Sequence, residues 1–295
     1  MSKHHYIPQF YLKRWLNPNR YIHCYNYISD ELVSFQKKSV TDIGQVRNLY
    51  KDLEVNHYAT LDGKAANVIK IIDEEIREKD NKLILLDDIL SYELREDFCR
   101  FISSLTGRQT KDINLAQKHV AKHVGELRNK YDWIPGANTI IESFDKTAAN
   151  LIIAARSGYA SSRFKTIPDN ALPMLLDLKW YAIKFKNLKF DLLTTEKPVC
   201  FYRSFKGPKI QCNHLNDLLR NGYVLSFPLS PAVCFYASLV IGQPINLGNI
   251  IKFQNKLLFS NAPLEVYSTT PSHEPLIKKF LIQSKNVNLK IGDMD

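Results

Sequence analysis

The sequence predicts an α+β fold in which a helical middle part and a β-rich C-terminal part share one core. Apolar residues recur at helical spacing between about residues 58 and 178, and they alternate with polar residues in short runs from about residue 179 onward. A chain of 295 residues that is 45% hydrophobic can bury a sizeable core. We therefore expect a single domain over residues 1–295, with a mostly antiparallel sheet at about 179–295 that residues 1–40 complete.

The first element is a short extended segment that begins at His4 and His5, and Pro8 prevents a helix from running through its centre. Successive side chains of an extended segment point to opposite sides, so the two imidazoles should have different roles. We expect one to be buried against the C-terminal half and the other to line a pocket near Gln9. The simpler interpretation is an ordinary terminal strand that carries exposed histidines.

A hairpin should follow. Residues 9–16 suit a short turn of helix that ends at Asn17-Pro18-Asn19. Residues 20–28 then alternate, with Tyr21 and His23 on one face and apolar residues on the other, and a partner strand should return after residue 30. The aromatic face could stack nucleic-acid bases, although a wall of the core is the commoner use.

Helical spacing predicts helices at about residues 60–79 and 85–105, and further helices up to residue 178. Asp62 lies just inside the first helix, where a carboxylate favours the helix dipole. Capping is its commoner role, and facing a metal ion is the alternative. Arg108 follows the second helix, where a guanidinium can grip a phosphate or simply pair with the dipole.

The C-terminal part should form the sheet, with one late helix at about residues 250–259 that carries Asn255. The expected strands are residues 180–186, 188–193, 199–202, 223–229 and 232–238. Lys184, Lys186 and Lys189 interleave with aromatic side chains on the first two strands. Such a face suits a phosphate backbone, and it equally suits a solvated sheet edge that lysines protect.

Charge and cysteine usage narrow the class of protein. The 40 Lys and Arg outnumber the 30 Asp and Glu, which gives a formal net charge of +10 and favours nucleic acid among possible partners. A lysine-rich surface on a soluble protein explains the same charge. The five cysteines are scattered and never form a Cys-x-x-Cys pair, which predicts a reduced, cytoplasmic protein. The sequence shows no signal peptide or membrane span, so we expect no membrane partner.

The opening His4-His5-Tyr6-Ile7-Pro8-Gln9 resembles the His-His-Tyr-Val-Pro-Gln signature of the domain-of-unknown-function family numbered four-two-three-eight. Weaker matches follow in order at residues 194–199, 227–231 and 255–268, and they cover nearly the whole chain. Glu196 and Lys197 stand where that family usually has Asp and Asn, and Asp62 stands where it usually has Glu. The resemblance implies an architecture and a set of site residues, but no reaction.

The polar residues of these segments are the types that phosphoryl chemistry uses. An imidazole serves as general base or metal ligand, a carboxylate binds a divalent ion, and an arginine stabilises developing charge. The candidates are His4, His5, Gln9, Arg108 and Glu196 for catalysis, Lys13, Arg14, Lys184, Lys186 and Lys189 for nucleic-acid binding, and Asp62 and Asn255 as further site residues.

We therefore expect a cytosolic nuclease or phosphodiesterase that acts on RNA or DNA with Mg²⁺ or Mn²⁺, as in a bacterial defence or toxin setting. The alternative is a nucleic-acid-binding or sensing module without chemistry, because the same cationic surface and aromatic side chains would bind without cleaving. A third interpretation is a structural or partner-binding protein whose first histidines merely anchor the N-terminus.

Overall fold

The computed structural model describes most of the N-terminal segment, two central helices and most of the C-terminal sheet. The described residues are 3–29, 32–47, 58–107, 175–186, 190–203, 223–238, 247–260 and 263–281, with single helical positions at 122, 126 and 129. The helices expected between residues 108 and 174 therefore lie almost entirely outside the described residues.

The described strands form three sheets, and within each sheet all pairing is antiparallel. The first sheet has five strands in the order β5 (Leu83–Leu85), β6 (Lys179–Lys184), β10 (Val233–Ser238), β9 (Tyr223–Ser230) and β8 (Cys200–Arg203). The second has four strands in the order β3 (Leu32–Lys38), β2 (Ile22–Ser29), β11 (Glu265–Ser268) and β7 (Thr194–Thr195). A small third sheet pairs β1 (Lys3–His5) with β4 (Gln45–Arg47).

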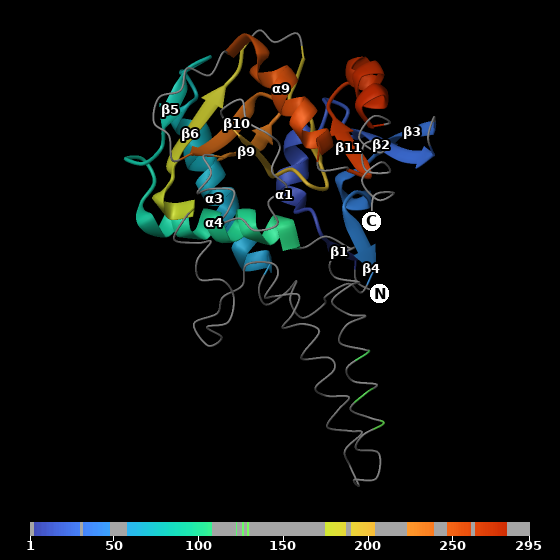
Figure 1. The fold of residues 1–295 in the computed structure, drawn as a ribbon, viewed down its shortest axis with the longest axis horizontal. Helices are drawn as coiled ribbons and strands as arrows, with labels where there is room; N and C mark the ends of the chain where they lie inside the picture. Colours follow the sequence, from blue (N-terminus) through green and yellow to red (C-terminus); the bar gives the residue numbers. More distant parts are fainter. Residues whose placement is uncertain are drawn as a thin grey trace.

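Helices cover both faces of the five-stranded sheet (Figure 1). The labelled α-helices are α1 (Gln9–Leu12), α3 (Ala59–Glu75), α4 (Tyr92–Gly107) and α9 (Leu247–Ser260), and a 3₁₀ turn at Lys13–Trp15 continues α1. Residues 175–177 and 274–281 are also helical. Helices α3 and α4 pack against the sheet face that carries Phe227 and Phe235. Ile251 of α9 belongs to the buried cluster on the other face, which includes Cys234 and Tyr236.

Aromatic rings form the centre of the larger core. The ring of Phe98 on α4 meets Phe235 edge-on at 5.2 Å, and Tyr11 on α1 stacks on Phe227 at 5.2 Å. Each of these rings is fully buried. Rings of this size bury large apolar areas and gain further from offset or edge contacts. The opening segment is therefore part of the core that α4 and the C-terminal strands share.

Hydrogen bonds also tie the start of the chain to its C-terminal half. The Tyr11 hydroxyl contacts Thr194 Oγ1 at 2.6 Å and donates to the Pro228 carbonyl at 2.8 Å. The indole N–H of Trp15 donates to the Leu192 carbonyl at 3.2 Å. As a result α1 lies between the five-stranded and the four-stranded sheets (Figure 1). The expected α+β fold is confirmed, and these contacts join the opening segment to Leu192, Thr194 and Pro228.

Two expected elements differ from the structure. Residues 83–85 form strand β5, so the helix expected from residue 85 begins only at Tyr92. Pairing with β6 decides this, because a short apolar run fits a strand as well as a helix. Residues 190–193 are not a strand, because the N–H groups of Asp191 and Leu193 bond to side chains instead of a neighbouring strand.

Candidate functional site

A pocket of about 300 Å³ opens between the opening segment and the first turn of α3. Its lining residues are His5, Pro8, Gln9, Phe10, Asp62, Gly63 and Ala66. Three of the candidates chosen from the sequence, His5, Gln9 and Asp62, thus meet at one place although they come from three elements. The structure places an imidazole, an amide and a carboxylate around a solvent-open space.

The backbone at and after His5 is fixed by β4 and the loop that leads into it. His5 pairs with Gln45 across the two-stranded sheet, and the next two N–H groups, of Tyr6 and Ile7, donate to the Gly44 carbonyl at 2.8 and 3.3 Å. Gly44 has a φ of +61°, which only glycine adopts without cost, and a Cβ there would lie 2.8 Å from Ile7 Cβ. Gly44 therefore allows the close contact that sets the position of His5.

The side chains of His5 and Gln9 are hydrogen-bonded to each other. Gln9 Nε2 lies 3.0 Å from His5 Nε2 and 3.5 Å from Nδ1. An amide nitrogen only donates, so His5 Nε2 accepts this bond and the neutral ring carries its proton on Nδ1. Gln9 thereby selects one tautomer of the imidazole and occupies its single ring lone pair, on Nε2.

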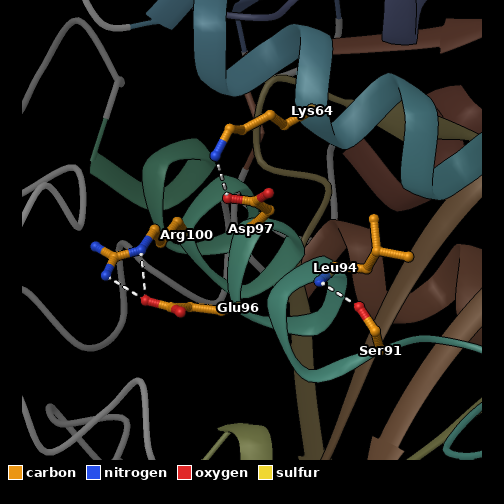
Figure 2. A network of polar contacts seen from close by, with 6 residues as sticks. All are labelled: Lys64, Ser91, Leu94, Glu96, Asp97 and Arg100. Atoms are coloured by element: carbon orange, nitrogen blue, oxygen red, sulfur yellow. Dashed lines mark hydrogen bonds and ion pairs between the residues drawn. The ribbon is translucent and has the colours of Figure 1, made fainter.

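Asp62 lines the pocket from α3. The basic residue nearest to it in the sequence, Lys64, pairs with another carboxylate. Lys64 Nζ lies 2.9 Å from Asp97 of α4, as Figure 2 shows, and this ion pair joins the two helices. In the same view Arg100 is bonded to Glu96 at 2.5 Å. None of the seven lining residues is a lysine or an arginine. Among these described lining residues, Asp62 therefore carries the one formal charge when His5 is neutral.

Glu196 does not line this pocket. Its carboxylate is buried, with 8% of the residue exposed, and it accepts hydrogen bonds from the N–H groups of Leu264 at 2.6 Å and Glu265 at 3.0 Å. Burial raises the pKa of Glu196 above its ordinary value, while these two hydrogen bonds act in the opposite direction. Both of its oxygens are used to hold the start of β11.

Asn255 has a similar backbone-holding arrangement. Its Oδ1 accepts from the Leu193 N–H at 2.8 Å, and its Nδ2 donates to the Asp191 carbonyl at 2.9 Å. The side chain is 1% exposed. An amide that satisfies one donor and one acceptor of an irregular segment replaces the strand neighbour that the segment lacks. Asn255 thus supports the segment that precedes Thr194.

The structure describes four of the basic candidates, and three of them form ion pairs. Arg14 binds Asp73 through two hydrogen bonds of 2.7 and 2.8 Å and donates from Nε to the Leu229 carbonyl, so it links α3 to β9. Lys184 and Lys186 pair with the two oxygens of Asp80 at 2.9 and 2.8 Å. Lys13 is exposed. The remaining candidates, Arg108, Lys189 and the side chain of His4, lie outside the described residues.

Ser268 and His273 form a serine–histidine pair, but the direction of their hydrogen bond does not activate the serine as a nucleophile. His273 Nε2 accepts from the Asp191 N–H at 3.2 Å, so the ring proton lies on Nδ1, which faces Ser268 Oγ at 2.9 Å. Ser268 in turn donates to the Thr270 carbonyl at 2.9 Å. A histidine that donates to a serine does not take the serine's proton. Both side chains are buried and brace the segment next to β11.

The pocket includes lining residues that the sequence did not single out. Phe10 and Pro8 belong to the opening segment, so their neighbours His5 and Gln9 could have indicated them. Gly63 follows Asp62 inside a helix, where glycine is a poor helix former, and that cost is itself a sequence signal. Ala66 lies one helical turn after Asp62 and carries no such signal.

The described residues contain no group of three or more His, Cys, Asp or Glu side chains that could together hold a metal ion. The pocket offers a mixed set instead, with the imidazole of His5, the carboxylate of Asp62 and the amide oxygen of Gln9. Oxygen donors suit Mg²⁺ and Mn²⁺, and Mg²⁺ keeps several waters with few protein ligands. In the part of the chain that the structure describes, no helix has the length and apolarity needed to cross a membrane.

Comparison with known proteins supports one relationship. A family model described as "Protein of unknown function (DUF4238)" matches residues 3–269. No curated protein and no solved structure matches the chain. The matched range includes both the pocket and the backbone-holding residues Glu196 and Asn255.

Proposed function

The chain belongs to the family of proteins of unknown function DUF4238, and we propose that it is a metal-dependent phosphodiesterase that cleaves RNA or DNA at the pocket of His5, Gln9 and Asp62. One observation carries the proposal: these three side chains, chosen for their chemistry, line the same open pocket. The net charge of +10 adds a general attraction for polyanions.

His5 is the general base in this proposal. The Gln9 amide keeps Nε2 in the acceptor state at 3.0 Å. A water or a ribose hydroxyl that takes the place of the amide proton donates to the same lone pair. Its oxygen forms a bond to phosphorus while His5 accepts its proton, the bond from phosphorus to the leaving oxygen breaks, and solvent water protonates that oxygen. A base of this kind typically contributes about 10²- to 10⁴-fold in rate. The backbone contacts to Gly44 hold the ring where this transfer takes place.

Asp62 has a different task. A phosphodiester that approaches the pocket alone would meet a carboxylate and no lysine or arginine in the lining. Asp62 and the Gln9 amide oxygen are suited to bind a divalent ion, which would supply the positive charge that the phosphate needs. The proposal therefore requires a divalent metal ion, and activity should vanish when the ion is removed.

The test is cleavage of labelled single-stranded RNA, single-stranded DNA and duplex DNA by the purified chain, with Mg²⁺, with Mn²⁺ and with chelator. We expect cleavage that needs a metal ion and falls strongly in Asp62→Asn. The matched control is Asp97→Asn, because Asp97 is an acid on the neighbouring helix that pairs with Lys64 and does not line the pocket. No product from any substrate under any of these conditions would overturn the proposal, and binding without cleavage would favour the non-catalytic module.

A further inference from the structure

Gly63 is a residue that helix α3 does not itself require. Glycine is the poorest helix former after proline, since it has the most backbone freedom to lose. Its φ is not in the left-handed region, and a Cβ added at Gly63 would have no atom within 4 Å apart from its chain neighbours and the backbone of its own helix. Gly44 is the opposite case, with a φ of +61° and a Cβ position 2.8 Å from Ile7. Neither backbone conformation nor a close neighbour explains glycine at position 63.

The pocket does explain it. Gly63 lines the pocket between Asp62 and, one turn later, Ala66. The helix wall here carries a hydrogen and a methyl group where larger side chains would fill the space. A ligand can therefore come close to the α3 backbone while it reaches the carboxylate of Asp62 and the imidazole of His5.

The remaining lining residues indicate which chemical class of ligand fits the space beside Gly63. Phe10 and Pro8 present flat apolar faces, and the ring of Phe10 is supported by Phe101 of α4 at a centroid distance of 5.5 Å. Gln9 and Asp62 form the polar rim beside these faces, and in the proposed function they hold the metal ion and with it the phosphate. Aromatic faces with mixed polar groups at their rim are how proteins hold an unpaired base. A groove that followed a phosphate backbone would need cations, and the lining has no lysine or arginine.

We propose that the pocket admits one unpaired nucleotide and that Gly63 is the specificity-determining residue that leaves room for its base. The volume of about 300 Å³ lies at the small end of ligand sites, so a stacked base pair is excluded. The substrate is then a single strand, or a nucleotide turned out of a duplex. The cleavage part of this inference rests on the proposed function, whereas the binding part does not.

The experiment compares Gly63→Ala and Gly63→Leu with Asn67→Leu, which places the same side chain at an exposed position of α3 that does not line the pocket. Binding of the four ribonucleoside monophosphates is measured by thermal shift and calorimetry, and binding of one oligonucleotide is measured as a single strand and as a duplex. We expect Gly63→Leu to melt no lower than the unmodified protein and to bind nucleotides and single strands at least about tenfold more weakly. Gly63→Ala should be intermediate, and Asn67→Leu unchanged.

The outcomes separate this inference from the proposed function. One outcome is that the unmodified protein binds nucleotides, Gly63→Leu does not, and neither cleaves under any condition. This outcome would support the nucleotide-binding inference and overturn the proposed phosphodiesterase activity. Cleavage that persists undiminished in Gly63→Leu would overturn the inference and leave the activity standing. Failure of the unmodified protein to bind any of the nucleotides, or tighter binding of duplex than of single strand, would also overturn it.

Discussion

The two ends of the matched family range use polar side chains in different ways. At the N-terminal end, His5 and Gln9 bond to each other at the edge of an open pocket. At the C-terminal end, Glu196 and Asn255 are buried, and their hydrogen bonds go to backbone groups. A polar residue whose atoms are saturated by backbone holds a chain segment in place, whereas one that faces a cavity is available to a ligand. Polar side chains of comparable chemistry therefore serve a ligand site at one end and hold backbone segments in place at the other.

The strongest test of this contrast is His5→Ala. We expect catalytic turnover to fall by about 10²- to 10⁴-fold, because the general base is lost. The melting temperature should change little, since the side chain is only partly buried at the pocket edge. Steady-state cleavage and thermal unfolding measured on the same preparation check both parts. A large loss of stability with unchanged turnover would reverse the roles assigned to the two ends.

Asn255→Ala should give the largest change in stability. It leaves the Leu193 N–H and the Asp191 carbonyl without a partner, which should cost roughly 2–6 kcal/mol of unfolding free energy at about 1–3 kcal/mol for each group. The neighbouring Gln254 is the matched control, because its buried amide has no hydrogen-bond partner among the described residues. We expect Gln254→Leu to be neutral or stabilising in urea denaturation. Equal losses in the two variants would contradict this account.

The C-terminal end should also make the protein less stable in mild acid. Burial lowers the pKa of His273 below its ordinary value of 6.5, so the unfolded chain takes up a proton more readily than the folded one. This contribution to stability is complete above about pH 6.5 and declines as the pH falls toward the lower pKa of the folded state. His23 is shifted in the same direction. Denaturation curves at several pH values should show a shallower decline for His273→Gln than for the unmodified protein.

The smallest effect should come from Lys186→Ala. Lys186 is exposed and pairs with Asp80, and exposed ion pairs contribute about 0–1 kcal/mol. Because Asp80 already binds the Lys186 ammonium group, that group is less available to a phosphate, and removing the lysine should hardly change affinity for an oligonucleotide. Lys13→Ala, at an exposed lysine beside α1, is the comparison. A loss of affinity in Lys186→Ala as large as that in Lys13→Ala would assign the β6 face to nucleic acid after all.

The sequence predicted elements well where a local pattern decides them. Alternation located β2 and β6, helical spacing located α3, and the ranges expected for β9, β10 and α9 overlap the observed elements. Strands β5 and β11 were not predicted, because runs of three and four residues acquire their structure only from the neighbours they pair with.

The candidate site shows the same limit. Residue chemistry was enough to select His5, Gln9 and Asp62, which the structure brings together. Residue chemistry did not separate them from Glu196, because a carboxylate bound to backbone and a carboxylate in a pocket look the same in a sequence. The difference depends on where β11 begins, and that is set by contacts between residues far apart in the chain.

The position of β11 has a consequence for biosynthesis. This strand, at residues 265–268, lies between β2 and β7, and its pairs include Val266 with Tyr25. The β2–β3 hairpin is made early but keeps an open edge until nearly the whole chain has left the ribosome. Contacts of such long sequence separation slow folding, and an unpaired edge meanwhile exposes the nascent chain to aggregation. A chain released by a ribosome that stalls before residue 265 would lack β11, so its four-stranded sheet could not join β2 to β7.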